Sequence, residues 1–226
     1  MAGDGNNDTI KLVQAAAYDV RLAASTDSLT ISRPVTIAGS GVDAASTLRP
    51  RAGVGNFNMF VISSPSTVTI QGVIIRDVNH AHAMMVNSGA SARLMYSWVL
   101  NSGSSGDSTG GALWNKGGLT LSNVEFSGCQ GWLSGAVYNT GSVFIDASAF
   151  VGNDGARVGA FPNNGSTAWA SINNTTFGKN IANNQATAIA NFNGGFLELN
   201  GVTVFNNGVE SNSMFNIAAL DRKSVV

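Results

Sequence analysis

The sequence predicts an all-β fold, a single-domain right-handed parallel β-helix (solenoid) of about eight coils of 24–28 residues. The first observation behind this prediction is a short apolar segment that ends in Asn and recurs along the chain. Successive Asn residues of this series are 28, 24, 24, 28 and 25 residues apart: Asn87, Asn115, Asn139, Asn163, Asn191 and Asn216. A nearly fixed period of this length is typical of stacked supersecondary units rather than of a globular core.

The second observation is the alternation of apolar residues within each repeat. In the repeat over 111–134, Leu119 and Leu121 alternate with polar residues, and Val124 and Phe126 do the same after a Ser-Asn turn. Period-2 runs separated by Gly, Asn or Ser indicate short strands joined by turns. Three strands and three turns per repeat describe one coil. A helix is excluded because Gly and Asn occupy positions where they would destabilise it.

The third observation is that aligned repeats place apolar residues in two inward columns. These columns are Ile70, Leu94, Leu121, Ile145, Ile172 and Leu199, and Ile75, Val99, Phe126, Phe150, Phe177 and Val204. Stacking at the strand spacing of about 4.8 Å would bury them, and a one-residue slip would turn a whole column outward. The recurring Asn is expected to form a ladder of side-chain amides inside a turn, where Asn also tolerates a left-handed backbone.

In chain order, the β-helix domain is predicted over 1–220, with less regular coils over 1–66 and regular repeats over 67–216. Residues 221–226 are expected to form a C-terminal tail. The early strand pairs are Ile10 and Leu12, Val20 and Leu22, Leu29 and Ile31, and Val35 and Ile37. An open β-helix end is an unpaired sheet edge. Two outcomes therefore stay open at the ends: continuation in a longer protein, or end-to-end or lateral self-association.

Composition excludes several function classes. Charged residues make up 11% of the 226 residues and the net charge is -1, with no basic stripe, so nucleic acid is not an expected partner. The longest apolar runs are three or four residues, so no transmembrane helix is predicted. Cys129 is the single cysteine, which rules out a disulfide within the chain. No cofactor is predicted.

Several stretches resemble a known family: residues 3–12, 29–31, 34–39 and 68–76, together with the Gly-Ala-x-x-Asn repeats from Gly111 onward. They are similar to bacterial secreted right-handed parallel β-helix repeat proteins of the CSLREA type and to the repeats of polymorphic autotransporter passenger domains. The resemblance implies export to the cell surface or the medium, and no particular activity. The family's Cys-rich motif would precede Met1, and no signal peptide is seen, so we expect the chain to be an excised fragment.

The preferred binding site lies at outward positions beside the Asn column. Trp114 and Tyr138 fall on adjacent coils, where neighbouring aromatic rings could stack on a sugar or contact a protein partner. Trp132 and Arg157 are further candidate binding residues: they fall in the turns that correspond to the His80 and His82 turn one or more coils earlier, and could line one face of a cleft. The simpler alternative is that a loop covers these rings or that they only pack sideways.

A second candidate site is catalytic. His80 and His82 form a His-x-His pair close to Asp77, and Asp107 falls in the corresponding turn of the next coil. The spacing also suits metal ligands, but no third ligand is evident, so no metal site is predicted. The alternative is two ordinary turn histidines.

A carbohydrate-active enzyme of this fold would need paired carboxylates. Asp146 and Glu198 are two coils apart, about 10 Å by strand spacing, with no acidic residue between them. The preferred function is therefore an extracellular or cell-surface module that binds carbohydrate or a surface partner through a solvent-facing aromatic strip. The alternatives are a polysaccharide lyase or glycoside hydrolase with a groove near His80 and His82, and a structural spacer or adhesin stalk.

Overall fold

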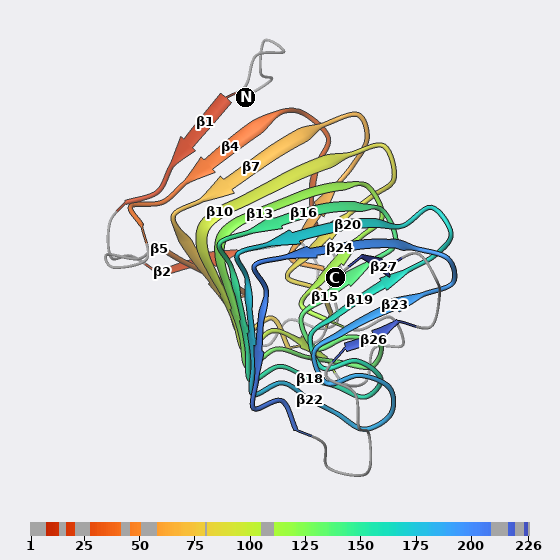
Figure 1. Ribbon diagram of the computed structural model, residues 1–226. Helices are drawn as coiled ribbons and strands as arrows, with labels where there is room; N and C mark the ends of the chain where they lie inside the picture. The colour runs from red at the N-terminus through yellow and green to blue at the C-terminus, as the bar shows by residue number, and fades with distance from the viewer. Residues whose placement is uncertain are drawn as a thin grey trace.

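The computed structural model describes residues 8–13, 17–20, 28–41, 46–50, 58–79, 81–104, 111–208, 217–219 and 224–225. Every regular element in these ranges is a β-strand, and every strand pairing is parallel (Figure 1). The strands form three sheets of 15, eight and four strands that wind around a common interior. The predicted class, an all-β parallel β-helix, is confirmed.

The 15-stranded sheet carries two runs of strands. The main run is β1 (Asp8–Lys11), β4 (Val35–Ala38), β7 (Thr67–Gln71), β10 (Ser91–Leu100), β13 (Gly118–Ser127), β16 (Ser142–Asp146), β20 (Trp169–Asn173), β24 (Phe196–Asn200) and β27 (Ser224–Val225). The other strands are β2 (Ala17–Val20), β5 (Ser46–Pro50), β8 (Val73–Arg76), β17 (Ala149–Val151), β21 (Thr176–Gly178) and β25 (Thr203–Phe205). The long strands β10 and β13 join the two runs because each pairs in both.

The two smaller sheets complete the coil. The eight-stranded sheet comprises β3 (Leu29–Ile31), β6 (Phe60–Ile62), β9 (Met84–Val86), β12 (Leu113–Asn115), β15 (Val137–Asn139), β19 (Phe161–Asn164), β23 (Ile189–Phe192) and β26 (Ile217–Ala219). The four-stranded sheet comprises β11 (Gly103–Ser104), β14 (Gln130–Gly131), β18 (Asp154–Gly155) and β22 (Ile181–Ala182).

The stack makes about six turns, which is fewer than the eight expected from the sequence. The six main-run strands from β7 to β24 mark these turns, and the difference lies in the less regular coils over 1–66. In the structure, Ile10, Val20 and Leu29 lie on β1, β2 and β3, which are successive sides of the coil that precedes β4. The early coils are also longer: Val35 pairs with Val68, 33 residues further along the chain.

Both predicted inward columns are confirmed by the strand register. In the first column, Leu94 pairs with Ile70 on one side and with Leu121 on the other, and the series continues to Leu199. In the second column, Phe126, Phe150 and Phe177 are fully buried and their rings stack almost parallel. These columns form the core, and burial of their apolar surface is the main force that holds the coils together.

The predicted amide ladder is formed by four of the six Asn residues. The side-chain Nδ2 of Asn115 donates to Oδ1 of Asn139 at 2.7 Å, and the same contact repeats from Asn139 to Asn163 at 2.7 Å and from Asn163 to Asn191 at 2.8 Å. All four are fully buried. Asn87 is only half-buried, and Asn216 lies outside the described residues.

A second amide ladder, which the sequence reasoning missed, precedes the four-stranded sheet. Asn153 Nδ2 donates to Asn180 Oδ1 at 2.9 Å, and Asn180 Nδ2 donates to Asn207 Oδ1 at 3.0 Å. Cys129 holds the same position one coil earlier, where its backbone N–H donates to Asn153 Oδ1. The thiol is buried at the end of this ladder and packs in the core cluster.

Burial raises the pKa of the Cys129 thiol from about 9 to about 12, because the thiolate would lose its hydration. Between pH 9 and 12 the unfolded chain therefore releases a proton that the folded chain keeps. We expect the free energy of unfolding to fall by up to about 1.4 kcal/mol per pH unit in this range. Urea denaturation across this range, compared with Cys129→Ala, tests the expectation. An equal slope in both proteins would contradict it.

Candidate functional site: a trough on the eight-stranded sheet

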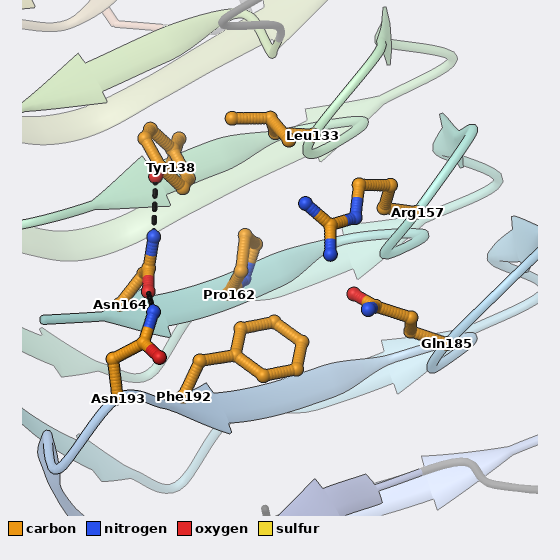
Figure 2. A pocket seen from close by; sticks show the side chains of 8 residues that line it. All are labelled: Leu133, Tyr138, Arg157, Pro162, Asn164, Gln185, Phe192 and Asn193. Atoms are coloured by element: carbon orange, nitrogen blue, oxygen red, sulfur yellow. Dashed lines mark hydrogen bonds between the residues drawn. The ribbon is translucent and has the colours of Figure 1, made fainter.

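A trough with a volume of about 190 Å³ lies on the outer face of the eight-stranded sheet, over β15, β19 and β23 (Figure 2). Its position follows from strand alternation. Val137, Phe161 and Ile189 point inward and are fully buried, so the residues that follow them point to the outer face.

The floor of the trough is largely apolar. Tyr138 and Pro162 each follow an inward residue on adjacent coils, and Phe192 lies one coil further along beside Asn164, with which it pairs. Pro162 cannot donate a ladder hydrogen bond, and the pairing of β15 with β19 is limited to Asn139 with Asn163. Figure 2 shows these three side chains in one row across the strands.

The wall of the trough comes from the segments that lead out of β14, β18 and β22. Leu133, Arg157 and Gln185 form a second row opposite the floor (Figure 2). Backbone hydrogen bonds hold this row in register: Arg157 N–H donates to the Trp132 carbonyl at 3.0 Å, and Gln185 N–H donates to the Arg157 carbonyl at 3.0 Å. The wall therefore stacks coil on coil like the sheets beside it.

A chain of side-chain hydrogen bonds runs along the opposite edge. Asn164 Nδ2 donates to the Tyr138 hydroxyl at 2.6 Å, and Asn193 Nδ2 donates to Asn164 Oδ1 at 2.7 Å (Figure 2). These bonds fix the tyrosine ring across three coils. The tyrosine O–H itself remains a donor that can turn toward a bound molecule.

Two polar groups of the wall have unused hydrogen-bonding capacity. The Oε1 atom of Gln185 is buried and has no hydrogen-bond partner. The side chain of Arg157 is exposed, and its guanidinium forms no ion pair with any described residue. An unsatisfied buried acceptor costs about 1–3 kcal/mol, which a bound hydroxyl or amide donor would relieve. The trough thus offers one free acceptor and one free cationic donor above an apolar floor.

The predicted aromatic pair is present, but the prediction that both rings face solvent is wrong for Tyr138. The ring centroids of Trp114 and Tyr138 are 6.1 Å apart, as expected for adjacent coils. Tyr138 is only 8% exposed because it forms part of the trough floor. Trp114 is half-buried, with Lys116 Nζ 3.9 Å from its ring centroid. Its buried Nε1 has no hydrogen-bond partner.

Of the two predicted binding residues in turns, only one lies at the trough. Arg157 lines the trough, whereas Trp132 is 48% exposed and is replaced there by its neighbour Leu133. The sequence reasoning also missed Gln185, Asn193 and the floor residue Phe192. The floor position of Phe192 could be predicted from the Asn ladder, because Asn164 and Phe192 directly follow ladder residues on adjacent coils. The wall residues lie in turns, and no repeating sequence pattern predicts their position.

Of the catalytic candidate, the structure describes only His82, which is buried. His82 is 3% exposed, and its Nδ1 lies 2.7 Å from the Gly111 carbonyl oxygen. The centroid of its ring lies 5.7 Å from that of Trp114, in an edge-on arrangement. The His82 ring is therefore not open to solvent. His80 and Asp107 lie outside the described residues.

The two outward carboxylates lie on different columns. Asp146 pairs with Asn173 and accepts a hydrogen bond from Asn174, whereas Glu198 pairs with Ser171. Over the described ranges, no three His, Cys, Asp or Glu side chains gather closely enough to hold a metal ion. Nowhere in those ranges does the chain form an apolar helix of membrane-spanning length.

Compared with known proteins, the chain matches no protein-family model, no curated protein and no solved structure.

Proposed function

We propose that this chain is a non-catalytic, extracellular or cell-surface β-helix module that binds a saccharide chain in the trough. The observation that carries the proposal is the pairing of an apolar floor with two unused polar groups. Tyr138 and Phe192 supply surfaces for the apolar face of a sugar ring. The Arg157 guanidinium donates to a sugar oxygen, and the Gln185 carbonyl, buried in the free protein, turns toward the trough to accept from a sugar hydroxyl.

The types of side chain in the trough favour binding over hydrolysis. Of the described residues that line it, none is an Asp, Glu, His, Cys or Lys. Glycoside hydrolysis commonly needs two carboxylates beside the scissile bond, and a lyase needs a base. The site therefore offers affinity and orientation for a sugar without the paired carboxylates that glycoside hydrolysis commonly uses. A protein partner at the cell surface is the main alternative occupant.

The trough also suits a linear ligand. Its floor and wall repeat from coil to coil at about 4.8 Å, so equivalent contacts recur along the stack axis. A chain of similar units can meet these contacts one after another.

We expect Phe192→Ala and Arg157→Ala each to weaken saccharide binding at least tenfold, about 1.4 kcal/mol. Phe192→Ala removes a stacking surface, and Arg157→Ala removes the cationic donor. A glycan array would identify the ligand, and titration calorimetry would measure each affinity. Trp132→Ala is the matched control, because it removes an exposed tryptophan that does not line the trough.

Two results would overturn the proposal. Unchanged affinity in both trough variants would place the ligand elsewhere. Release of reducing or unsaturated sugar in the binding assay would show catalysis and return attention to the region of His80 and Asp107. A lack of binding to every glycan on the array, combined with capture of a cell-surface protein that Phe192→Ala abolishes, would establish the alternative occupant.

A further inference from the structure

A second hollow, with a volume of about 290 Å³, lies on the outer face of the 15-stranded sheet. It extends over β7, β10, β13, β16 and β20, whereas the trough lies over strands of the eight-stranded sheet. The two sites are therefore built from different sheets and share no lining residue.

The strand register explains the hollow. One outward column contains small residues on three successive coils, namely Ser91, Gly118 and Ser142, and then two large rings, Trp169 and Phe196. The missing side chain at Gly118 lowers the floor between its serine neighbours. The indole ring of Trp169 then rises at one end of this low stretch.

Three aromatic side chains form what we call the aromatic step: Phe144, Trp169 and Phe196. The rings of Trp169 and Phe196 stack with centroids 6.2 Å apart and an interplanar angle of 5°. Phe144 is 41% exposed and Trp169 is 38% exposed. Neither side chain belongs to the buried core, which closes without them. A contiguous group of exposed rings on a face otherwise rich in hydroxyls marks a binding surface.

The positive charge in the hollow indicates that its ligand carries a negative group. Of the described residues that line it, Arg93 alone is charged, and its exposed guanidinium forms no ion pair with a described residue. Arg93 lies three coils from Trp169, about 14 Å along the stack. Glu198 lies outside the hollow, beyond Trp169 on β24. A ligand that spans the hollow would therefore place its negative group at the Arg93 end.

We propose that this hollow binds a linear acidic saccharide, with a sugar ring stacked on Trp169 beside Phe144 and a carboxylate on Arg93. The hydroxyls of Thr120 and Ser142 lie on the coils between these two ends, and that of Ser91 lies on β10 near Arg93; all three can bond to sugar hydroxyls. A stable protein interface buries about 800 Å² on each partner, with an apolar centre. The narrow, hydroxyl-lined hollow with one exposed step fits an oligosaccharide better than a protein surface.

The test uses cellohexaose and its hexaglucuronate derivative, which share a backbone and differ in their carboxylates. The indole N–H resonance of Trp169, assigned through its loss in Trp169→Phe, reports on binding at the step. We expect hexaglucuronate to shift this resonance and to bind at least tenfold more tightly than cellohexaose. Trp169→Ala and Arg93→Ala should each weaken hexaglucuronate binding about tenfold, and Arg93→Ala should leave cellohexaose binding unchanged.

Controls separate this site from the trough. Trp132→Ala should bind hexaglucuronate like the unmodified protein, and Phe192→Ala should leave the shift of the Trp169 resonance intact, whatever happens in the trough. The proposal is overturned if hexaglucuronate leaves the Trp169 resonance unmoved or if the two sugars bind equally. It is also overturned if an oligoglutamate peptide shifts the resonance as strongly as hexaglucuronate does, since the site would then recognise acidic peptides.

Discussion

Replacement of Phe150 with alanine is expected to lower the free energy of unfolding by about 3–5 kcal/mol. The ring is fully buried between Phe126 and Phe177, at centroid distances of 5.2 and 4.6 Å and interplanar angles of 8° and 5°. Its removal leaves a cavity and takes a stacking partner from both neighbours. Urea denaturation followed by far-ultraviolet circular dichroism measures the loss.

The matched control is Phe144→Ala on β16. Phe144 is a phenylalanine of the adjacent strand that points outward and is 41% exposed. We expect its loss to cost about 1–2 kcal/mol, clearly less than the loss at Phe150, because 41% of Phe144 already lies in water and its removal leaves no closed cavity. Equal losses in the two variants would contradict the view that the interior column holds the coils together.

A gap at Phe150 should also change how the protein unfolds. In a solenoid each coil contacts only its neighbours, so stability is a sum of coil and interface terms. Loss of the central ring weakens the interfaces on both sides of one coil. We therefore expect Phe150→Ala to unfold over a broader range of urea than the unmodified protein, as the two halves of the stack lose cooperativity.

The interior was predictable from the sequence because its signal repeats. Ile145 and Phe150 recur in register with residues about 24–27 positions away, and any other alignment would turn an apolar column outward. The number of coils was less predictable. Near the N-terminus, all the strands have similar short apolar patterns. The sequence of a strand such as the one that contains Leu29 and Ile31 therefore does not show which coil it belongs to.

The candidate sites were predictable only where they depend on strand register. The neighbouring positions of Trp114 and Tyr138, and those of Trp169 and Phe196, follow from the same alignment as the core. Their exposure does not follow from it. Tyr138 is 8% exposed in the trough that it shares with Leu133, whereas Trp169, whose neighbour on the previous coil is the small Ser142, is 38% exposed. The exposure of such rings depends on the turns and on neighbouring side chains, and these repeat less strictly than the strands do.

The ladder of buried amides provides the second large expected effect on stability. Asn139 Oδ1 accepts from Asn115, and Asn139 Nδ2 lies within hydrogen-bond distance of Asn163 Oδ1 at 2.7 Å, the Gly141 carbonyl at 3.0 Å and the Trp169 carbonyl at 3.2 Å. Asn139→Ala would leave buried donors and acceptors without partners on both sides. At about 1–3 kcal/mol for each unsatisfied group, we expect a total loss of about 2–4 kcal/mol.

Two further variants separate hydrogen bonding from packing at this position. Asn139→Asp keeps the shape of the side chain but replaces its donors with a buried carboxylate that faces oxygen atoms, so it should destabilise at neutral pH at least as much as Asn139→Ala. Asn193→Ala removes an amide that is exposed and bonded only to Asn164 among the described residues, and it should cost less than about 0.5 kcal/mol. Urea denaturation of all three variants gives the comparison. If Asn139→Asp were as stable as the unmodified protein, the ladder would contribute through shape alone, and its hydrogen bonds would not explain the recurrence of Asn in the sequence.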